Sequence, residues 1–316
     1  MNENETPKNT GQALAQQITN HIQELAKATD TALLSGEMQR YLETYSRFHQ
    51  YSTYNIFCIL MTNPNASVVA GFNKWKSLGR FVRKGEHGIP ILAPIVFKED
   101  PGDPNSRELI GGFRVVYVFD VSQTEGAPLP EPPNWKSPEQ NLILFNKLVT
   151  FAESRGISVA IKVLGGETQG VSMGGTIEID PSAGTKTLIH EVSHEILHRS
   201  GDIPMDSKIR ELEAESVAFC VARHFGLPSA GSPNYIALHG ASADLIMKHL
   251  ERIRKTASEI INALEKETDD VEYSALIGKP VKFMKGTIIF GPVRICSKEL
   301  IVEARVKKYS LHLIGN

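Results

Sequence analysis

Three histidines and two glutamates fall within residues 187–198, which read TLIHEVSHEILH. In a helix, His190 and His194 would lie one turn apart on the same face, because side chains four residues apart project in the same direction. That separation lets two imidazole rings bind a single cation. The segment is therefore a candidate metal site.

The glutamate between the two histidines suits a catalytic base. Glu191 leaves the histidine face at an angle that would bring its carboxylate beside an open coordination position. There it can take a proton from a water molecule whose pKa a metal ion lowers to about 7. The apolar residues around the two histidines predict a buried helix, in which unpaired polar groups would be costly. The sequence therefore favours metal ligands over surface histidines. That prediction rests on five apolar neighbours: Leu188, Ile189, Val192, Ile196 and Leu197.

A metal site of this kind needs a third protein ligand, and the segment RELEAESVAFCVARHFGL at 210–227 offers two candidates. Glu211 and Glu215 would share one helix face, where two carboxylates repel each other unless a cation or a histidine N–H compensates them. We expect Glu211 to be the third ligand and Glu215 to accept a hydrogen bond from a ligating histidine. The exchange of these roles and a solvated face are the alternatives.

Two more residues near the motif are assigned by their positions. Glu213 falls on the other side of its helix and is expected to be an ordinary surface charge. His198 continues the histidine face by one turn, but a third ligand on the same helix would give poor coordination geometry. We therefore expect His198 to be a buried partner or a cleft-lining side chain, with a ligand role as the alternative.

Hydrophobic periodicity predicts the elements that position these residues. In the C-terminal half, the expected elements are helices at about 139–155, 207–225 and 240–265, a helix with the histidine motif, and strands near 158–164 and over 174–180. In the N-terminal half, they are an amphipathic helix over 13–34, a helical stretch over 36–63, and paired strands over 88–97 and 110–124. Most of the aromatic residues spaced by three or four in the helical stretch are expected in the core: Tyr41, Tyr45, Phe48, Tyr51, Tyr54 and Phe57.

The five prolines within residues 125–139 exclude a helix or a central strand there, so we place the domain boundary in this segment. The sequence thus predicts an α+β protein with two main domains. Its parts are a disordered tail (1–12), an N-terminal α/β domain (13–125), a Pro-rich linker (126–138), a second domain (139–268) and a β-rich C-terminal segment (269–316).

Composition limits the classes of partner. The formal net charge of -2 predicts no overall attraction to nucleic acid or to a membrane, so any such attraction must be local. The three cysteines are far apart and outside any CxxC spacing, which argues against a disulfide framework or a cysteine zinc site. Without a signal peptide or an apolar span, the protein is expected to be cytoplasmic and to have no membrane partner; its oligomeric state is left open.

One local region is strongly basic. Between Arg40 and Lys98 there are eight Lys or Arg residues and two acids, Glu43 and Glu86, which gives a local charge of +6. Within it, the segment KWKSLGRFVRKGEHG interleaves aromatic residues with cations, a pattern that suits phosphate contacts and base stacking on single-stranded nucleic acid. The alternative is that Trp75 and Phe81 are core residues under a solvated basic hairpin.

The candidate DNA-binding residues follow from this pattern. Gln123 lies with Asp120 and Thr124 at a strand end, where it either orients a nucleotide or caps the turn. The full set is Lys74, Trp75, Lys76, Arg80, Phe81, Arg83, Lys84, Tyr54, Asn55 and Gln123.

HEVSH followed by ELEAES resembles the zincin metallopeptidases of the gluzincin kind, and its spacing is similar to that of the ImmA/IrrE-type peptidases. Their helix reads Glu-x-x-Ala-Asn where this one has Glu211, Ala214 and Glu215, so the last position departs from the pattern. The resemblance implies a zincin-like domain with its HExxH helix and one bound zinc ion, other divalent metals being possible. It also implies that the strand before the helix, GGTIEID at 174–180, borders the cleft and pairs with a peptide or protein substrate.

The first domain resembles the N-terminal single-stranded-DNA-binding domain of the plasmid antirestriction ArdC family. The resemblance is carried by YSTYNIFCIL, GFNKWKSLGRFVRKGEHGIPILAP and FRVVYVFDVSQTEG. It implies that single-stranded DNA is the partner of this domain and that the protein has an antirestriction role in conjugative transfer.

The expected function is therefore a single-stranded-DNA-binding zinc metallopeptidase with an antirestriction role, in which His190, His194 and Glu211 hold the metal and Glu191 is the base. Its activity is expected to be slow or linked to DNA. The first alternative is a protein that shields DNA by binding, with a mainly structural metal site. The second is a protease for DNA–protein crosslinks, similar in logic to the SprT-type repair enzymes, although a carboxylate third ligand argues against close kinship.

Overall fold

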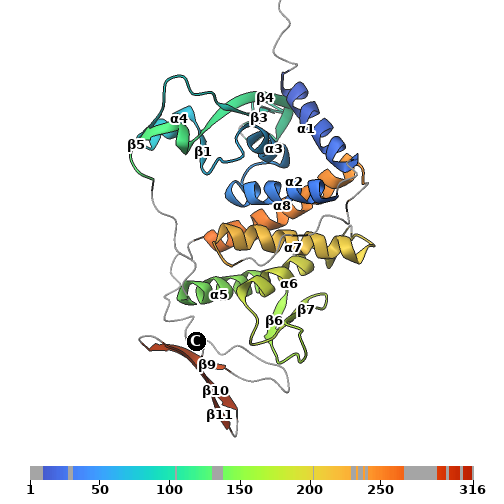
Figure 1. Ribbon diagram of the computed structural model, residues 1–316, viewed down its shortest axis with the longest axis vertical. Coiled ribbons are helices and arrows are strands. Elements are labelled where there is room, and N and C mark those ends of the chain that lie inside the picture. The colour runs from blue at the N-terminus through green and yellow to red at the C-terminus, as the bar shows by residue number, and fades with distance from the viewer. Residues whose placement is uncertain are drawn as a thin grey trace, which may run out of the picture. The chain divides into compact units, whose positions relative to one another are not determined.

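The computed structural model describes residues 10–27, 31–103, 105–129, 138–201, 203–228, 233, 238, 241–266, 290–296, 299–306 and 309–314. Contacts divide the chain into two compact units, Met1–Pro133 with Ser229–Ser258 and Asn134–Pro228 with Glu259–Asn316 (Figure 1). Each unit combines helices with a small sheet, as an α+β protein should. No helix within these described ranges is both long and apolar enough to cross a membrane.

Three helices open the first unit: α1 (Thr10–Lys27), α2 (Thr31–Arg47) and α3 (Thr53–Thr62). α1 buries Ile18, Ile22 and Leu25, the apolar face that its spacing predicts. The ring of Tyr41 on α2 stacks on Phe57 of α3 with 4.8 Å between centroids. Four residues of the aromatic row are buried and two are half-buried, so the expectation that most belong to the core is confirmed.

The expected helix boundaries need two corrections. α1 already begins at Thr10, inside the expected tail, and the remainder of that tail lies outside the described residues. The helical stretch expected over 36–63 is two helices, α2 and α3. Ser52 ends the interruption, because its side chain accepts a hydrogen bond from the backbone N–H of Asn55 and so caps α3.

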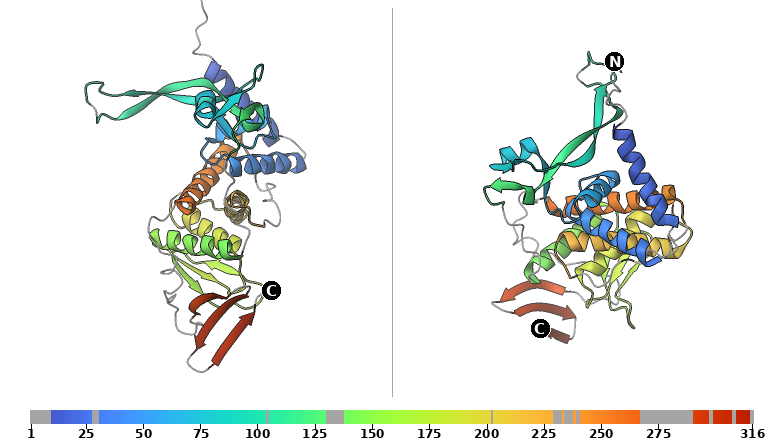
Figure 2. Two further views of the ribbon diagram at one scale, coloured as in Figure 1. Left: turned by 90° about the vertical axis from the view of Figure 1, so that its left-hand side faces the viewer. Right: turned by 45° about the horizontal axis from the view of Figure 1, so that its top comes forward.

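The sheet of the first unit has the order β1 (Val69–Gly71), β4 (Glu108–Asp120), β3 (Ile89–Lys98), and all pairs are antiparallel. β3 and β4 form a long ribbon that reaches well beyond the helices of its unit (Figure 2). β3 is an edge strand, which is why it tolerates Pro90 and Pro94. The expected pairing of 88–97 with 110–124 is confirmed.

A second, two-stranded sheet joins β2 (Arg80–Val82) to β5 (Thr124–Gly126). The short helix α4 (Phe72–Ser77) precedes β2, and the 3-10 turn η2 (Val121–Gln123) precedes β5. These pieces are held by Trp75, which is fully buried and whose Nε1–H donates to the carbonyl of Phe119 at 2.8 Å.

The helix α8 (Ala243–Glu265) belongs to both units, with the boundary after Ser258. Its first part packs in the first unit, where the hydroxyl of Tyr45 lies 2.7 Å from both the carbonyl of Arg254 and the Oγ of Ser258. The expected second domain, 139–268, therefore differs from the observed division over residues 229–258. Local hydrophobic periodicity cannot predict this division, because it depends on contacts between residues about two hundred positions apart.

The second unit begins with α5 (Pro138–Ser154) and a sheet of three strands, β6 (Ser158–Ile161), β7 (Gly170–Ser172) and β8 (Thr176–Ile179). The sheet order is β6, β8, β7, with β6 parallel and β7 antiparallel to β8. α6 (Thr185–His198) and α7 (Ser207–His224) follow and pack against each other.

The C-terminal strands β9 (Phe290–Cys296), β10 (Glu299–Val306) and β11 (Tyr309–Ile314) form an antiparallel sheet in the order β11, β10, β9. This agrees with the β-rich segment expected over 269–316. The start of that segment lies outside the described residues.

Candidate metal centre

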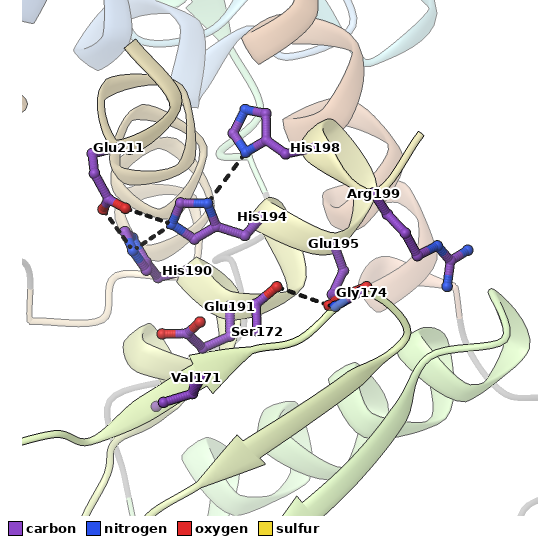
Figure 3. Close-up of a pocket in the computed structure, with 11 residues that line it drawn as sticks. Val171, Ser172, Gly174, His190, Glu191, His194, Glu195, His198, Arg199 and Glu211 are labelled. Carbon is purple, nitrogen blue, oxygen red and sulfur yellow. Dashed lines mark hydrogen bonds and ion pairs between the residues drawn. The ribbon is translucent and has the colours of Figure 1, made fainter. Parts of the chain in front are cut away.

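The histidine pair lies on α6. The helix begins directly after Gly184 and buries Leu188, Ile189 and Val192. His190 and His194 point toward α7, and their Nε2 atoms lie 3.0 Å apart (Figure 3). Two ring nitrogens at this distance need either one shared proton or a cation that accepts both lone pairs.

Glu211 on α7 completes a group of three ligands. Its Oε2 lies 3.4 Å from Nε2 of His190, and its Oε1 lies 3.4 Å from Nε2 of His194. Bonds of about 2.0–2.1 Å to a tetrahedral zinc ion place neighbouring ligand atoms about 3.3–3.4 Å apart. The observed distances of 3.0 to 3.4 Å thus fit one small divalent cation.

Glu215 contacts the other nitrogen of the same histidine. Its Oε2 lies 3.3 Å from Nδ1 of His190, within ion-pair distance but without hydrogen-bond geometry. Its Oε1 accepts a 2.7 Å hydrogen bond from the ammonium group of Lys186. Because Glu211 faces both Nε2 atoms and Glu215 faces only Nδ1, the geometry favours Glu211 as the third ligand.

The charges of this group depend on one another. Burial lowers the pKa of His190, but contacts with Glu211 and Glu215 outweigh it and raise the pKa to about 9. The two histidines hold the pKa of the Glu211 carboxyl well below its usual range. In the metal-free protein a proton on His190 therefore occupies the place where a cation would compensate the carboxylates.

His198 and Glu213 extend the group on its inner side. Nδ1 of His198 lies 3.2 Å from Nδ1 of His194, and Nε2 of His198 lies 2.9 Å from Oε2 of Glu213. His198 is thus a buried partner of His194. The expectation that Glu213 is a surface charge is wrong, because the side chain is 0% exposed. α7 is buried on several sides, and Glu213 meets His198 of α6 rather than water.

Glu191 is buried beside the histidines and borders β7. Burial raises the pKa of its carboxyl, and the neighbouring His190 and His194 offset only part of this rise. A Cβ at Gly170 would lie 2.8 Å from Cγ and Oε1 of Glu191, so only glycine leaves room for this carboxylate. Gly170 is a site residue that the sequence analysis does not find.

Glu195, four residues after Glu191, is a second residue that the sequence analysis misses. Its carboxylate accepts hydrogen bonds from the hydroxyl of Ser172 at 2.8 Å and from the backbone N–H groups of Gly174 and Gly175 at 2.8 and 2.6 Å. It therefore fixes the turn between β7 and β8 to the helix that carries the histidines. The available signal was its spacing from Glu191, which puts both carboxylates on one side of α6.

A cleft of about 540 Å³ lies at the three proposed ligands and is also lined by Glu191, Glu195 and His198. β7 forms one wall through Gly170, Val171 and Ser172 (Figure 3). The strand expected to border the cleft, GGTIEID, contains β8, which is paired on both sides and has no free edge. The edge strand at the cleft is β7, which pairs antiparallel with β8. Its three residues are too few for the sequence to have predicted a strand.

Three candidate DNA-binding residues have structural roles in the first unit. Trp75 is buried, as described above. The side-chain amide of Asn55 donates to the carbonyl of Leu92 and accepts from its N–H, at 2.9 and 2.8 Å, which ties α3 to β3. Gln123 caps η2: its Oε1 accepts from the N–H of Asp120, and its Nε2 donates to the carbonyl of His87. None of the three presents its polar or aromatic group freely to a ligand.

The remaining DNA-binding candidates differ in their contacts within the protein and in their exposure. Arg80 donates to Thr124 and Ala127, and Arg83 donates to Glu86 and to the carbonyl of Ser122. Tyr54 is half-buried. The exposed members of the set are Lys74, Lys76, Phe81, Arg83 and Lys84.

The N-terminal part of the chain is similar to a known family. Residues 8–119 match the family described as the N-terminal domain of anti-restriction factor ArdC. An uncharacterised protein of Bacillus anthracis is 27% identical over 281 residues, covering 72% of this chain and 47% of the relative. The chain thus spans about half the length of that relative.

Two solved structures are also similar. Both are of the antirestriction ArdC protein from plasmid R388, one metal-free and one with bound Mn(II). The metal-free structure is 20% identical with a TM-score of 0.42, covering 68% of this chain and 83% of its own. The Mn(II)-bound structure is 18% identical with a TM-score of 0.42, covering 72% and 98%.

Proposed function

We propose that this chain is a metal-dependent peptidase that binds single-stranded DNA and has an antirestriction role. The match of residues 8–119 to the N-terminal domain of anti-restriction factor ArdC supports the last two parts. The observation that carries the enzymatic part is the convergence of two histidine nitrogens and one carboxylate at 3.0 to 3.4 Å beside the buried Glu191.

His190, His194 and Glu211 are the proposed ligands of one zinc ion or another divalent cation. When bound, such an ion polarises a carbonyl oxygen and lowers the pKa of a water molecule. The contact of His198 with Nδ1 of His194 leaves Nε2 of that ring free for the metal. Glu215, which also binds Lys186, faces Nδ1 of His190 and leaves Nε2 of this second ring for the metal.

Glu191 is the proposed general base. It takes a proton from the attacking water and afterwards delivers it to the leaving amine, which balances the reaction: one C–N bond breaks and the elements of water are added. A raised pKa suits both steps, because the carboxylate must accept the proton and then release it. The space that Gly170 leaves keeps the carboxylate at the wall of the cleft.

The substrate is an extended peptide. β7 is the edge strand of its sheet and lines the cleft, so an extended peptide strand can pair with it by β-addition. Glu195 holds the turn after β7 and so keeps this edge in register with the histidines. We expect disordered segments of proteins to be cut and folded proteins to be spared.

The test of the enzymatic proposal is removal and return of the metal. The protein is stripped with a chelator and reloaded with Zn(II) or with Mn(II), and cleavage of a disordered protein is followed by mass spectrometry. We expect cleavage to vanish with the metal, to return with at least one of the ions, and to be absent in Glu211→Ala. Cleavage by the stripped protein at the rate of the loaded one would remove the metal from the reaction.

Protection of DNA by binding alone is the second candidate function. One observation favours it: the match to the antirestriction domain covers residues 8–119 and includes none of the metal-site residues. Plasmid transfer into restricting cells separates the two functions. If Glu191→Gln protects the incoming plasmid as well as the wild type does, protection comes from binding; if protection is lost while DNA binding is kept, it comes from proteolysis.

A further inference from the structure

The exposed aromatic side chains of the described residues all come from one stretch of the first unit, residues 72–117. They are Phe72, Phe81, Phe97, Phe113 and Tyr117, each between 51% and 58% exposed. All lie on α4, on β2 or on the β3–β4 ribbon, and none of the described residues of the second unit contributes one. Large exposed aromatic rings in one region of a surface mark a binding site more often than chance exposure does.

The same part of the chain is basic. Residues 72–97 and 109–119 contain six cations (Lys74, Lys76, Arg80, Arg83, Lys84 and Arg114) and one acid (Glu86), a charge of +5 in a chain of -2. Apart from Asp120, which is buried at the other end of β4, the acidic residues of the β3–β4 ribbon lie at its tip, between residues 98 and 108. Cations combined with aromatic rings suit a polyanion that carries flat bases.

Phe113 and Tyr117 share one face of the ribbon, since residues an even number apart on a strand project to the same side. Four residues of strand separate them by about 13 Å. They pair with Pro94 and Pro90 of the edge strand, and Ile110, paired with Val96, continues this face toward the tip. Ile110 is 63% exposed and Val96 is 46% exposed, so this face presents two aromatic rings and two aliphatic side chains to solvent.

We infer that the unpaired bases of single-stranded DNA stack on Phe113 and Tyr117, with phosphate groups held by the exposed lysines of α4 and of the turn after β2. The inference rests on the proposed function, and it moves the base contacts from Trp75, Asn55 and Gln123 to the ribbon. Those three side chains are occupied by contacts within the fold, whereas the rings of Phe113 and Tyr117 are open to a ligand.

Ile110 provides the matched control. Stacking needs a π face, which isoleucine lacks, so a base-binding ribbon should depend on the two rings and tolerate Ile110→Ala. A protein partner or a second copy of this chain would bury the whole apolar face and depend on all three residues. All three side chains are exposed, so their replacement should leave the fold intact, which circular dichroism checks.

The experiment uses the full chain and a fluorescein-labelled oligodeoxythymidylate, with the same sequence as a duplex for comparison. Phe113→Ala and Tyr117→Ala should each raise Kd for the single strand about tenfold, and the double variant should raise it about a hundredfold. Ile110→Ala should change Kd by less than about twofold, and Tyr117→Phe, which keeps the ring, should behave like the wild type.

Wild-type protein that binds the oligonucleotide while the double variant binds equally well would overturn the ribbon site and leave single-stranded-DNA binding standing. Wild-type protein that does not bind the oligonucleotide at all would overturn both. Equal losses in Ile110→Ala and Phe113→Ala would overturn base stacking. Base stacking would also be overturned if the wild type sediments as a dimer and the double variant as a monomer.

Discussion

At the scale of single residues, the assignment of the metal ligands depends on which nitrogen of His190 each carboxylate faces. Glu211 faces Nε2 of both histidines, whereas Glu215 faces only Nδ1 of His190. Glu211→Ala should therefore abolish stoichiometric zinc binding. Glu215→Gln should weaken it only about tenfold to a hundredfold, the usual effect of losing an outer partner of a ligating histidine.

Zinc affinity measured by competition with a chromophoric chelator checks this difference, with the exposed Glu167→Ala as the control for a lost surface charge. Equal affinities of the wild type and the Glu211→Ala protein would contradict the assignment.

The raised pKa of His190 predicts how metal binding depends on pH. With a pKa of about 9, His190 carries a proton at neutral pH in the metal-free protein, and a cation must displace it. Affinity should thus rise by about tenfold for each pH unit up to about pH 9 and then level off. Glu215→Gln removes one contact that raises this pKa, so its plateau should begin at lower pH. A wild-type affinity that is constant from neutral pH to pH 9 would contradict the ion pairs described here.

At the scale of elements, α6 and α7 are held together by a buried polar pair, His198 with Glu213. Glu213→Ala leaves His198 without this carboxylate and should lower the free energy of unfolding by about 3 kcal/mol. Urea denaturation of the metal-free protein measures this loss, so that changed metal affinity does not enter. Glu153→Ala, an exposed glutamate of α5, should cost less than about 0.5 kcal/mol. A loss no greater than that of the control would contradict the role given to Glu213.

The sequence predicts these helices better than it predicts how they face one another. The helical period alone places His190 and His194 on one face of their helix, and Glu211 with Glu215 on one face of the next helix. These spacings are enough to nominate the three metal ligands. Spacing fails for Glu213, since the identity of a polar residue does not show whether its face meets water or another helix. It also fails for β7, whose three residues are too few to produce an alternating pattern.

The same limit applies to the first unit. Interleaved aromatic and basic residues make residues 72–84 a candidate binding region, but the pattern does not separate the buried ring of Trp75 from the exposed ring of Phe81. That distinction depends on the hydrogen bond from Trp75 to Phe119, which lies 44 residues away in the sequence.

At the scale of the whole molecule, α8 makes the first unit discontinuous in the sequence. A fragment of residues 1–135 lacks the part of α8 that meets Tyr45 and that supplies Glu251 to the hydroxyl of Thr53 at 3.0 Å. The fragment should thus melt at lower temperature and less cooperatively than the full chain, as circular dichroism can measure. In the full chain, Tyr45→Phe should cost about 1 kcal/mol. Melting of the fragment at the temperature of the full chain would show that α8 is not part of the first unit.

The central claim is that the metal centre hydrolyses peptide bonds with Glu191 as the base. Glu191→Gln keeps the size of the side chain in its place beside Gly170 but removes the ability to accept a proton. The most direct test is the rate at which zinc-loaded wild type and Glu191→Gln cleave the same disordered substrate, with metal content and DNA affinity measured on both. We predict equal metal content, equal affinity for single-stranded DNA, and a rate about 10² to 10⁴ times lower in the variant. Cleavage by the metal-loaded variant at the wild-type rate would contradict the account.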